Sequence, residues 1–262
     1  MENTYIEVPV LSECFAKGKQ PDFLFWVGCL GSFDDRAKKI SRAFCKILSA
    51  CNVDYAVLGK EETCCGDPVR RAGNEMLYQM QALSIIEMLK MYEVKKIVTF
   101  CPHCFNTFKN EYPDLGGEYE VLHATDLLKQ LLIDGKLKIN EEILKNTSIT
   151  FHDPCYLGRA NDLYDTSREL IDKLSNFRTE MKRSKSFALC CGAGGAQMFK
   201  EAEKGDKEVF IERIEDVLET KANIVATACP YCMVMLTDGI KYKNKEEEIE
   251  NYDIIELIAK AL

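Results

Sequence analysis

The sequence predicts an α/β protein built from two tandem, pseudo-symmetric domains, each with a mostly parallel sheet. Two observations lead to this prediction. Short apolar runs alternate with stretches of helical period along the chain, which is typical of strands joined by crossover helices. A pattern of five cysteines also occurs twice, which indicates a duplicated unit. We expect domains at residues 22–136 and 147–262, with the boundary in the polar stretch Leu137–Thr147.

The repeated pattern consists of a lone cysteine, an adjacent cysteine pair followed by glycine, and a C-P-x-C segment. In both copies 34 residues separate the lone cysteine from the pair, and 35 or 37 residues separate the pair from the C-P-x-C segment. Ten of the thirteen cysteines belong to this pattern, so chance is a poor explanation for it. The first copy contains Cys29, Cys64, Cys65, Cys101 and Cys104, and the second contains Cys155, Cys190, Cys191, Cys229 and Cys232.

The composition is that of a globular protein in a reducing compartment. Hydrophobic residues make up 47% of the chain, and the net charge of −8 argues against nucleic acid as a partner. No apolar run is long enough to span a bilayer, and the N-terminus lacks the basic region and apolar core of a signal peptide. We therefore expect a cytoplasmic protein, in which thirteen cysteines require metal, redox chemistry or burial.

In the first half, short apolar runs predict strands, and helical spacing behind a capping residue predicts helices. The expected strands are Phe23–Val27, Tyr55–Leu58, Lys96–Phe100 and Glu118–His123. The expected helices run from Asp34 or Asp35 to Ser49, from Asn74 to Tyr92 and from Ala124 to Ile133. The apolar face of the second helix is expected to contain Leu77, Met80, Leu83, Ile86 and Leu89. Residues 1–21 read as a loosely docked arm containing Cys14, while Cys45 and Cys51 read as core thiols.

The second half repeats this order of elements. We expect strands at Ser148–Phe151 and Ala222–Thr227, helices at Asp165–Leu174, Val209–Thr220 and Ile254–Leu262, and a solvated charge run at Lys241–Glu250. Proline in each C-P-x-C segment suits the first turn of a helix. Every cysteine of the pattern therefore follows a strand, occupies a glycine-rich turn or begins a helix. These places gather at the carboxyl edge of a parallel sheet, so each copy should form a thiolate cluster there, near the domain interface.

Five thiolates from three segments are more than one zinc ion needs, whereas iron–sulfur clusters use cysteine thiolates as anchors. The alternative is a metal-free thiol–disulfide oxidoreductase that uses Cys101-Pro-His-Cys104 and Cys229-Pro-Tyr-Cys232. Thioredoxin-like folds of that kind place a cis-proline opposite the motif, and no proline follows Cys232. This alternative also leaves the cysteine pairs and the lone cysteines without a role.

The two copies resemble CCG (cysteine-rich) domains, the domain of the B subunit of heterodisulfide reductase, over about residues 23–260. Similar domains occur in iron–sulfur subunits of glycolate oxidase, lactate-utilisation and glycerol-3-phosphate dehydrogenase complexes. Three segments are most similar to bacterial iron–sulfur oxidoreductases: Cys64–Glu75, Cys101–Asn106 and His152–Gly158.

This resemblance implies two [4Fe-4S] clusters of the non-cubane type, each held by the five cysteines of one copy. It also implies a subunit of a multi-subunit oxidoreductase that reduces a disulfide or links a flavoprotein to quinone. No ferredoxin-type cysteine run is present, so the expected partner is a separate ferredoxin-like or flavoprotein subunit. Such a partner could be membrane-bound and could hold this chain at the inner face of the membrane. The sequence does not decide between a relay with saturated clusters and a reductase with an open iron.

Several residues beside the motifs are candidates for supporting roles. His103 could hydrogen-bond cluster sulfur or move a proton, or be a surface residue at a helix start. His152 is expected to anchor its turn rather than to act in catalysis, and His123 to be structural. Four arginines follow motif segments and could stabilise an anionic cluster or be solvated: Arg36, Arg70, Arg71 and Arg159.

Overall fold

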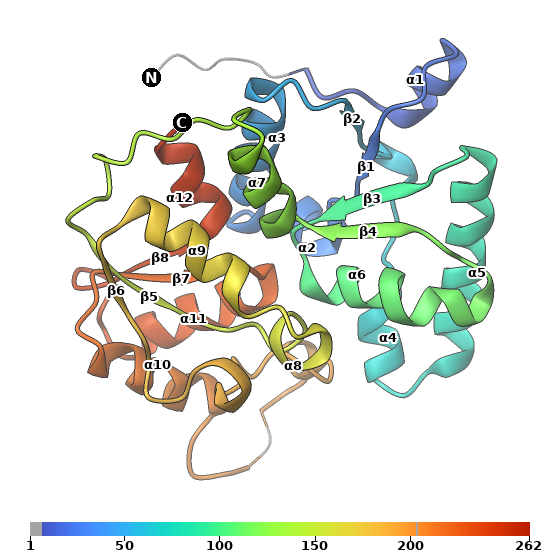
Figure 1. The fold of residues 1–262 in the computed structure, drawn as a ribbon. Helices are drawn as coiled ribbons and strands as arrows, with labels where there is room; N and C mark the ends of the chain where they lie inside the picture. The colour runs from blue at the N-terminus through green and yellow to red at the C-terminus, as the bar shows by residue number, and fades with distance from the viewer. Residues whose placement is uncertain (1–6, 203) are drawn as a thin grey trace.

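The structure, a computed structural model, describes residues 7–202 and 204–262 and contains two four-stranded sheets (Figure 1). The strand orders are β2-β1-β3-β4 and β6-β5-β7-β8, and every strand pair in these sheets is parallel. The two orders match strand for strand when the second half is laid over the first. The predicted architecture of two tandem, pseudo-symmetric α/β units is therefore confirmed, whereas the precise domain limits at 22–136 and 147–262 stay a prediction.

The first sheet is formed by the strands predicted for this half, each somewhat shorter than expected. They are β1 (Phe23–Phe25), β2 (Tyr55–Ala56), β3 (Lys96–Thr99) and β4 (Glu120–His123). The helices of this half are α1 (Leu11–Ala16), α2 (Gly28–Phe33), α3 (Ala37–Ala50), α4 (Asp67–Arg71), α5 (Glu75–Met91), α6 (Pro102–Asn106) and α7 (Ala124–Ile133). Asp34 accepts a hydrogen bond from the first amide of α3, and Asn74 caps α5, so both predicted helix starts are confirmed.

The second sheet contains two strands that the sequence did not reveal. Its strands are β5 (Ser148–Phe151), β6 (Phe177–Thr179), β7 (Ile224–Thr227) and β8 (Glu250–Asp253). The helices are α8 (Gly158–Asn161), α9 (Asp165–Leu174), α10 (Val209–Glu219), α11 (Pro230–Tyr242) and α12 (Ile254–Lys260). The unpredicted strands β6 and β8 lie at the sheet edges, where polar residues are tolerated. The end of the expected solvated run, Glu250, is in fact the first residue of β8.

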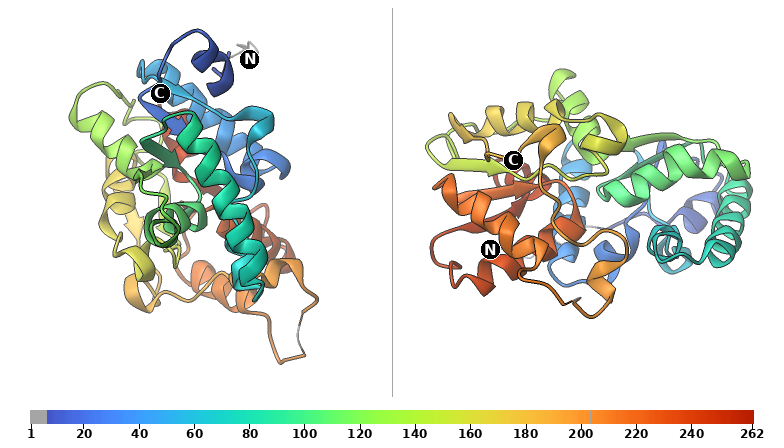
Figure 2. Two further views of the ribbon diagram at one scale, coloured as in Figure 1. Left: turned by 90° about the vertical axis from the view of Figure 1, so that its right-hand side faces the viewer. Right: turned by 90° about the horizontal axis from the view of Figure 1, so that it is seen from below.

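One hydrophobic cluster joins the two halves of the molecule. It contains Phe25 and Phe44 from the first half together with Leu170 and Ile258 from the second, all of them buried. Helix α12 packs against α3, α7 and α9, so helices from both halves meet between the sheets (Figures 1 and 2). This shared core fixes how the two sheets face each other. In the part of the chain that the structure covers, no helix is long and apolar enough to cross a membrane.

Helix α5 buries a different face from the one expected. Leu77, Met80 and Leu83 are 39%, 61% and 45% exposed, so their assignment to the apolar core is wrong. The buried side chains of this helix are Tyr78, Ala82, Ile85, Ile86 and Leu89. Apolar residues occur all around this helix, so their spacing does not select one face, and the Tyr78 ring packs against Gly66.

The N-terminal arm is docked over the part that the structure describes, rather than loose as expected. Val10 forms an isolated bridge with Val57, and Leu11 is buried. Cys14 lies in α1 and is partly exposed, whereas Cys45 and Cys51 are buried core thiols, as predicted. Residues 1–6 lie outside the described part of the chain.

Candidate functional site

All ten cysteines of the repeated pattern lie beyond the carboxyl ends of strands. Cys29 follows β1 within α2, and Cys101 follows β3 directly in front of α6. Cys155 and Cys229 hold the matching places after β5 and β7. Because neighbouring strands are parallel, these ends share one edge of each sheet, which brings the three segments of each copy together.

The five thiols of the first copy form one continuous chain of contacts. The Sγ atoms of Cys65 and Cys104 lie 3.5 Å apart. Interactions between neighbouring thiols also shift the pKa in three more pairs: Cys29 with Cys64, Cys64 with Cys65, and Cys104 with Cys101. The order of contact is therefore lone cysteine, first and second cysteine of the pair, then second and first cysteine of the C-P-x-C segment.

The second copy repeats this order without a change. Interactions between neighbouring thiols shift the pKa values in the same order: Cys155 with Cys190, Cys190 with Cys191, Cys191 with Cys232, and Cys232 with Cys229. The longer gap before Cys229 in the sequence therefore does not alter the order in which the thiols meet. The structure brings together all ten predicted site residues, as two groups of five.

Within each group the thiols share protons unequally. In the first copy, hydrogen bonds from Cys104 and Cys64 lower the pKa of Cys65 to about 6, whereas the hydrogen bond with Cys64, together with burial, raises the pKa of Cys29. In the second copy, Cys155 and Cys191 lower the pKa of Cys190. A thiolate held by neighbouring thiols is ready to bind a cation, and binding would release the remaining protons.

A glycine turn follows each cysteine pair for a geometric reason. Gly66 has φ 92° and Gly192 has φ 95°, a region in which side chains are strained. The amide of Gly66 donates to Cys64 Sγ at 3.4 Å, and the amide of Gly192 donates to Cys190 Sγ at 3.3 Å. A Cβ atom at Gly66 would lie only 2.7 Å from the Tyr78 ring. The Cys-Cys-Gly sequence therefore directs both pair thiols and one backbone donor to the same site.

The donor set suits an iron–sulfur cluster. Each group consists of five sulfur atoms, and soft thiolates favour iron–sulfur clusters over hard cations such as Mg²⁺. A tetrahedral zinc ion would leave one thiol of each group unused. The C-P-x-C cysteines and the second cysteine of each pair are buried, whereas the lone cysteines and the first cysteine of each pair are partly exposed.

The two groups meet at the interface between the sheets. The Tyr231 hydroxyl lies 3.5 Å from Cys29 Sγ, and the His103 ring contacts the rings of Tyr156 and Tyr231 with centroid distances of 4.4 and 4.5 Å. His103 is 6% exposed and its Nδ1 lies 2.7 Å from Asp67, so its interpretation as a surface residue is wrong. Burial opposes the imidazolium form, but hydrogen bonds with Asp67 and Cys229 raise the pKa of His103 well above its usual value.

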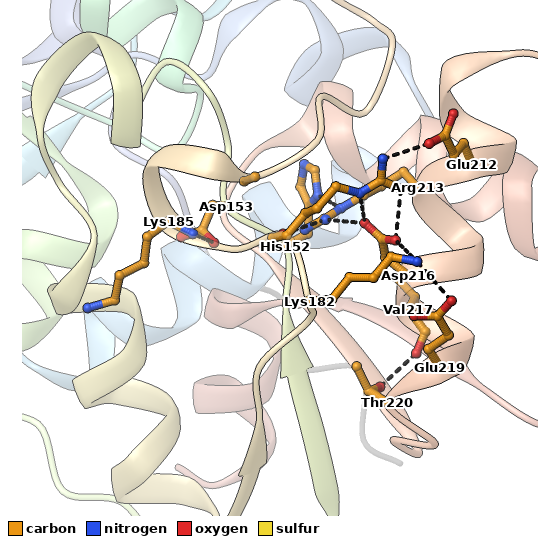
Figure 3. Close-up of polar contacts among 12 residues, drawn as sticks. His152, Asp153, Lys182, Lys185, Glu212, Arg213, Asp216, Val217, Glu219 and Thr220 are labelled. Carbon is orange, nitrogen blue, oxygen red and sulfur yellow. Dashed lines mark hydrogen bonds and ion pairs between the residues drawn. The ribbon is translucent and has the colours of Figure 1, made fainter.

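A network of charged residues surrounds His152, Arg213 and Asp216 (Figure 3). His152 Nδ1 accepts a hydrogen bond from Nε of Arg213 at 2.9 Å, and Arg213 is 0% exposed. Asp216 bridges Arg213 and Arg183 at 3.2 and 2.7 Å. One ring nitrogen of His152 and the sulfur atoms of Cys191 and Cys232 lie within 4.8 Å of one another. Burial and the Arg213 charge hold the pKa of His152 well below its usual range.

The hydrogen bonds of His152 also fix its tautomer. Because Nδ1 accepts, the proton lies on Nε2, which has no hydrogen-bond partner among the described residues. A buried N–H donor beside two sulfur atoms fits a site whose acceptor is the sulfur of a bound cluster. His152 thus anchors its turn, as predicted, and presents a donor to the second group.

The first group has a carboxylate in the corresponding region. Glu62 accepts hydrogen bonds from the amides of Val27 and Gly28 at 3.1 and 2.6 Å. Burial raises the pKa of Glu62 to about 7 against these two bonds. Nothing in its polar loop reveals this role.

Arg213 and Asp216, by contrast, form a charged pair at i, i+3 on the otherwise apolar face of α10, a pattern that could have revealed the buried network.

The remaining candidates all have partners within the protein. Arg36 bonds both carboxylate oxygens of Glu256 at 2.6 Å and so joins the two halves. Arg70 and Arg71 both pair with Glu111, and Arg159 donates to a backbone carbonyl. None of these four arginines is simply solvated. His123 caps α7 and is buried, with its pKa lowered to about 4 by that burial, so its structural role is confirmed.

Comparison with known proteins agrees with this geometry. The family model described as "Cysteine-rich domain" (CCG) matches residues 23–109 and again residues 149–237. The chain is 43% identical over 257 residues to "Probable iron-sulfur-binding oxidoreductase FadF" of Bacillus subtilis. This match covers 98% of this chain and 36% of that protein. It is 39% identical over 251 residues to "EtfAB:quinone oxidoreductase" of Syntrophomonas wolfei, covering 94% of this chain and 35% of that protein.

An archaeal relative completes the comparison. The D subunit of dihydromethanophenazine:CoB--CoM heterodisulfide reductase of Methanosarcina barkeri is 34% identical over 250 residues, covering 92% of this chain and 59% of that protein. The chain therefore spans about a third of the length of the two bacterial relatives. Both matched segments contain a complete five-cysteine pattern. The chain belongs to the CCG family of cysteine-rich domains and contains that domain twice.

Proposed function

We propose that this chain is the iron–sulfur subunit of an oxidoreductase and passes electrons between partner proteins through two [4Fe-4S] clusters. Cys29, Cys64, Cys65, Cys101 and Cys104 would hold the first cluster, and Cys155, Cys190, Cys191, Cys229 and Cys232 the second. The observation that carries the proposal is the repeated chain of five thiol contacts, which gives each site one sulfur more than four metal corners require. The fifth sulfur and the adjacent pair favour the non-cubane type.

The arrangement of the two groups favours electron transfer between them. Buried aromatic side chains lie between the groups, and the Tyr231 hydroxyl already contacts Cys29. When bound, the clusters would supply one-electron redox chemistry. The chain's own residues orient the ligand sulfurs, exclude water with the buried rings of His103 and Tyr231, and hold a hydrogen-bond donor at His152.

Reduction of a disulfide is the second candidate. It is supported by the similarity to a protein named as part of a heterodisulfide reductase and by the partial exposure of four cysteines. Those four thiols are the lone cysteine and the first cysteine of the pair in each copy: Cys29, Cys64, Cys155 and Cys190. A substrate sulfur would have to reach iron through this partly exposed side of the groups.

A metal-free thiol–disulfide oxidoreductase is not favoured. Reactive cysteines of that class are partly exposed, whereas Cys101, Cys104, Cys229 and Cys232 are all buried. Each C-P-x-C segment also contacts its own cysteine pair, which that mechanism does not use.

The expected partner is a ferredoxin-like subunit, a flavoprotein subunit, or both. The similarity to "EtfAB:quinone oxidoreductase" supports electron transfer from a flavoprotein toward quinone, and a membrane-bound subunit could be among the partners. The thirteen free cysteines fit a reducing compartment, so we place the chain on the cytoplasmic side.

The test is reversible reduction of the anaerobically purified protein, followed by visible absorption. We expect broad iron–sulfur absorption that bleaches with dithionite and returns on oxidation by a quinone analogue. The matched control is Cys45→Ser, which changes a buried thiol outside the pattern and should leave the absorption unchanged. Protein without a reducible chromophore would contradict the proposal.

A further inference from the structure

The two residues enclosed by the C-P-x-C cysteines occupy equivalent positions but differ in type. His103 lies between Cys101 and Cys104, and Tyr231 lies between Cys229 and Cys232. Both side chains are buried, at 6% and 3% exposure, in the interface between the two halves. Their rings contact each other, with centroids 4.5 Å apart. Each residue therefore extends from its own motif toward the other one.

Tyr231 belongs to the second motif but contacts a cysteine of the first. Its hydroxyl lies 3.5 Å from Cys29 Sγ, across 202 positions of sequence. The hydroxyl is the better donor of the two groups when the sulfur is a thiolate, since a thiolate has no proton to give. The second motif thus supplies a hydrogen-bond donor to the first.

His103 makes the reciprocal contact. Its Nδ1 lies 2.7 Å from Asp67 Oδ2, which leaves Nε2 as the nitrogen available to the second motif. The ring packs on Tyr231 of the second motif, with centroids 4.5 Å apart, and the His103 side chain also interacts with Cys229. Asp67 follows the first cysteine pair and holds the His103 ring in place, supported by Arg71 at 3.3 Å. The first motif thus supplies a donor to the second.

We propose that the two clusters are tuned crosswise: Tyr231 raises the reduction potential of the cluster on the first motif, and His103 raises that of the cluster on the second. Hydrogen bonds to ligand sulfur stabilise the reduced, more negative state of a cluster and so raise its potential. This inference rests on the proposed function, because it takes Cys29 and Cys229 as cluster ligands. With crosswise hydrogen bonds, the interface between the two halves contributes to the environment of each cluster.

The test separates the two clusters genetically. Cys191→Ser should leave only the first cluster, and Cys65→Ser only the second. In the Cys191→Ser background, Tyr231→Phe should shift the midpoint potential of the first cluster to a more negative value in an EPR-monitored redox titration. Tyr156→Phe removes a hydroxyl of the same interface that has no hydrogen bond to cysteine among the described residues, so it should leave that potential unchanged.

The His103 half of the proposal is tested in the Cys65→Ser background. His103→Phe should shift the potential of the second cluster to a more negative value, and His103→Gln, which keeps an N–H donor, should restore part of the difference. Iron content and circular dichroism report whether each variant is folded and loaded.

Two kinds of failure are distinguishable. Loaded protein in which Tyr231→Phe and His103→Phe leave these potentials unchanged would overturn crosswise tuning and leave the proposed function standing. Absence of iron from the wild-type protein would overturn the proposed function and, with it, this inference.

Discussion

Replacing Gly66 by alanine tests whether the turn after the first cysteine pair is required for both its backbone conformation and its close packing. Gly66 and Gly73 have almost the same φ, 92° and 91°. They differ in their surroundings: a Cβ at Gly66 would lie 2.7 Å from the Tyr78 ring, whereas no heavy atom lies within 4 Å of a Cβ at Gly73. Gly73→Ala is therefore a matched control for the conformational cost alone.

The expected magnitudes follow from this comparison. A positive φ costs alanine about 1–2 kcal/mol of folding free energy, and both variants should lose this amount. Gly66→Ala should lose about 1–3 kcal/mol more, because the buried Tyr78 ring has little room to move and overpacking a core has this cost. Displacement of the turn would also move Cys64 and Cys65, so we expect the first cluster to be lost from this variant only.

The assay is urea unfolding followed by circular dichroism, together with iron analysis of both variants after anaerobic purification. Gly73→Ala should keep the full iron content. If Gly66→Ala unfolds at the same urea concentration as Gly73→Ala and retains all its iron, the packing argument for the Cys-Cys-Gly turn is refuted.

Three further predictions concern the ligands and the buried charges. Cys191→Ser should remove about half of the iron and leave the first cluster intact; iron content equal to that of Cys45→Ser would contradict the ligand assignment. Arg213→Leu should lower the free energy of unfolding by about 3 kcal/mol because it breaks a buried ion pair, whereas Arg178→Leu at the surface should cost less than about 1 kcal/mol; equal losses in urea unfolding would argue against the network. Folding lowers the pKa of His123 from 6.5 to about 4. As the pH falls, the unfolded chain therefore binds a proton at this histidine before the folded chain does, and the free energy of unfolding should decrease by about 3 kcal/mol between pH 6.5 and pH 4. His123→Asn should show a smaller decrease between about pH 7 and about pH 5 than the wild type, and parallel curves would refute this assignment.

The sequence was sufficient to predict the central strands and the duplication. Strands β1, β3, β5 and β7 lie inside the sheets, so they read as apolar runs, and the cysteine spacing defined the repeat. The edge strands β6 and β8 were missed because their sequences, Phe-Arg-Thr and Glu-Asn-Tyr-Asp, contain no apolar run, which an edge position tolerates. Helix α5 has apolar residues on every side, so periodicity could not select the face that packs under Gly66.

The ten cysteines of the candidate site were predictable because their spacing repeats, but their surroundings were not. The contacts of His103 and Tyr231 with the opposite motif depend on how the two halves dock, which no local pattern records. Glu62 lies in a polar loop, and its bonds to two amides after β1 depend on how that loop folds over the strand end. Such interactions across domains and loops are set by tertiary structure.

The central claim is that each five-cysteine group holds one cluster, and iron and acid-labile sulfide per chain test it most directly. After anaerobic purification, we expect about eight irons and about eight sulfides per chain, with an EPR spectrum unlike that of a cubane cluster. About four irons would contradict two equivalent sites. Absence of iron, with redox-active thiols at Cys101 and Cys104, would contradict the account as a whole.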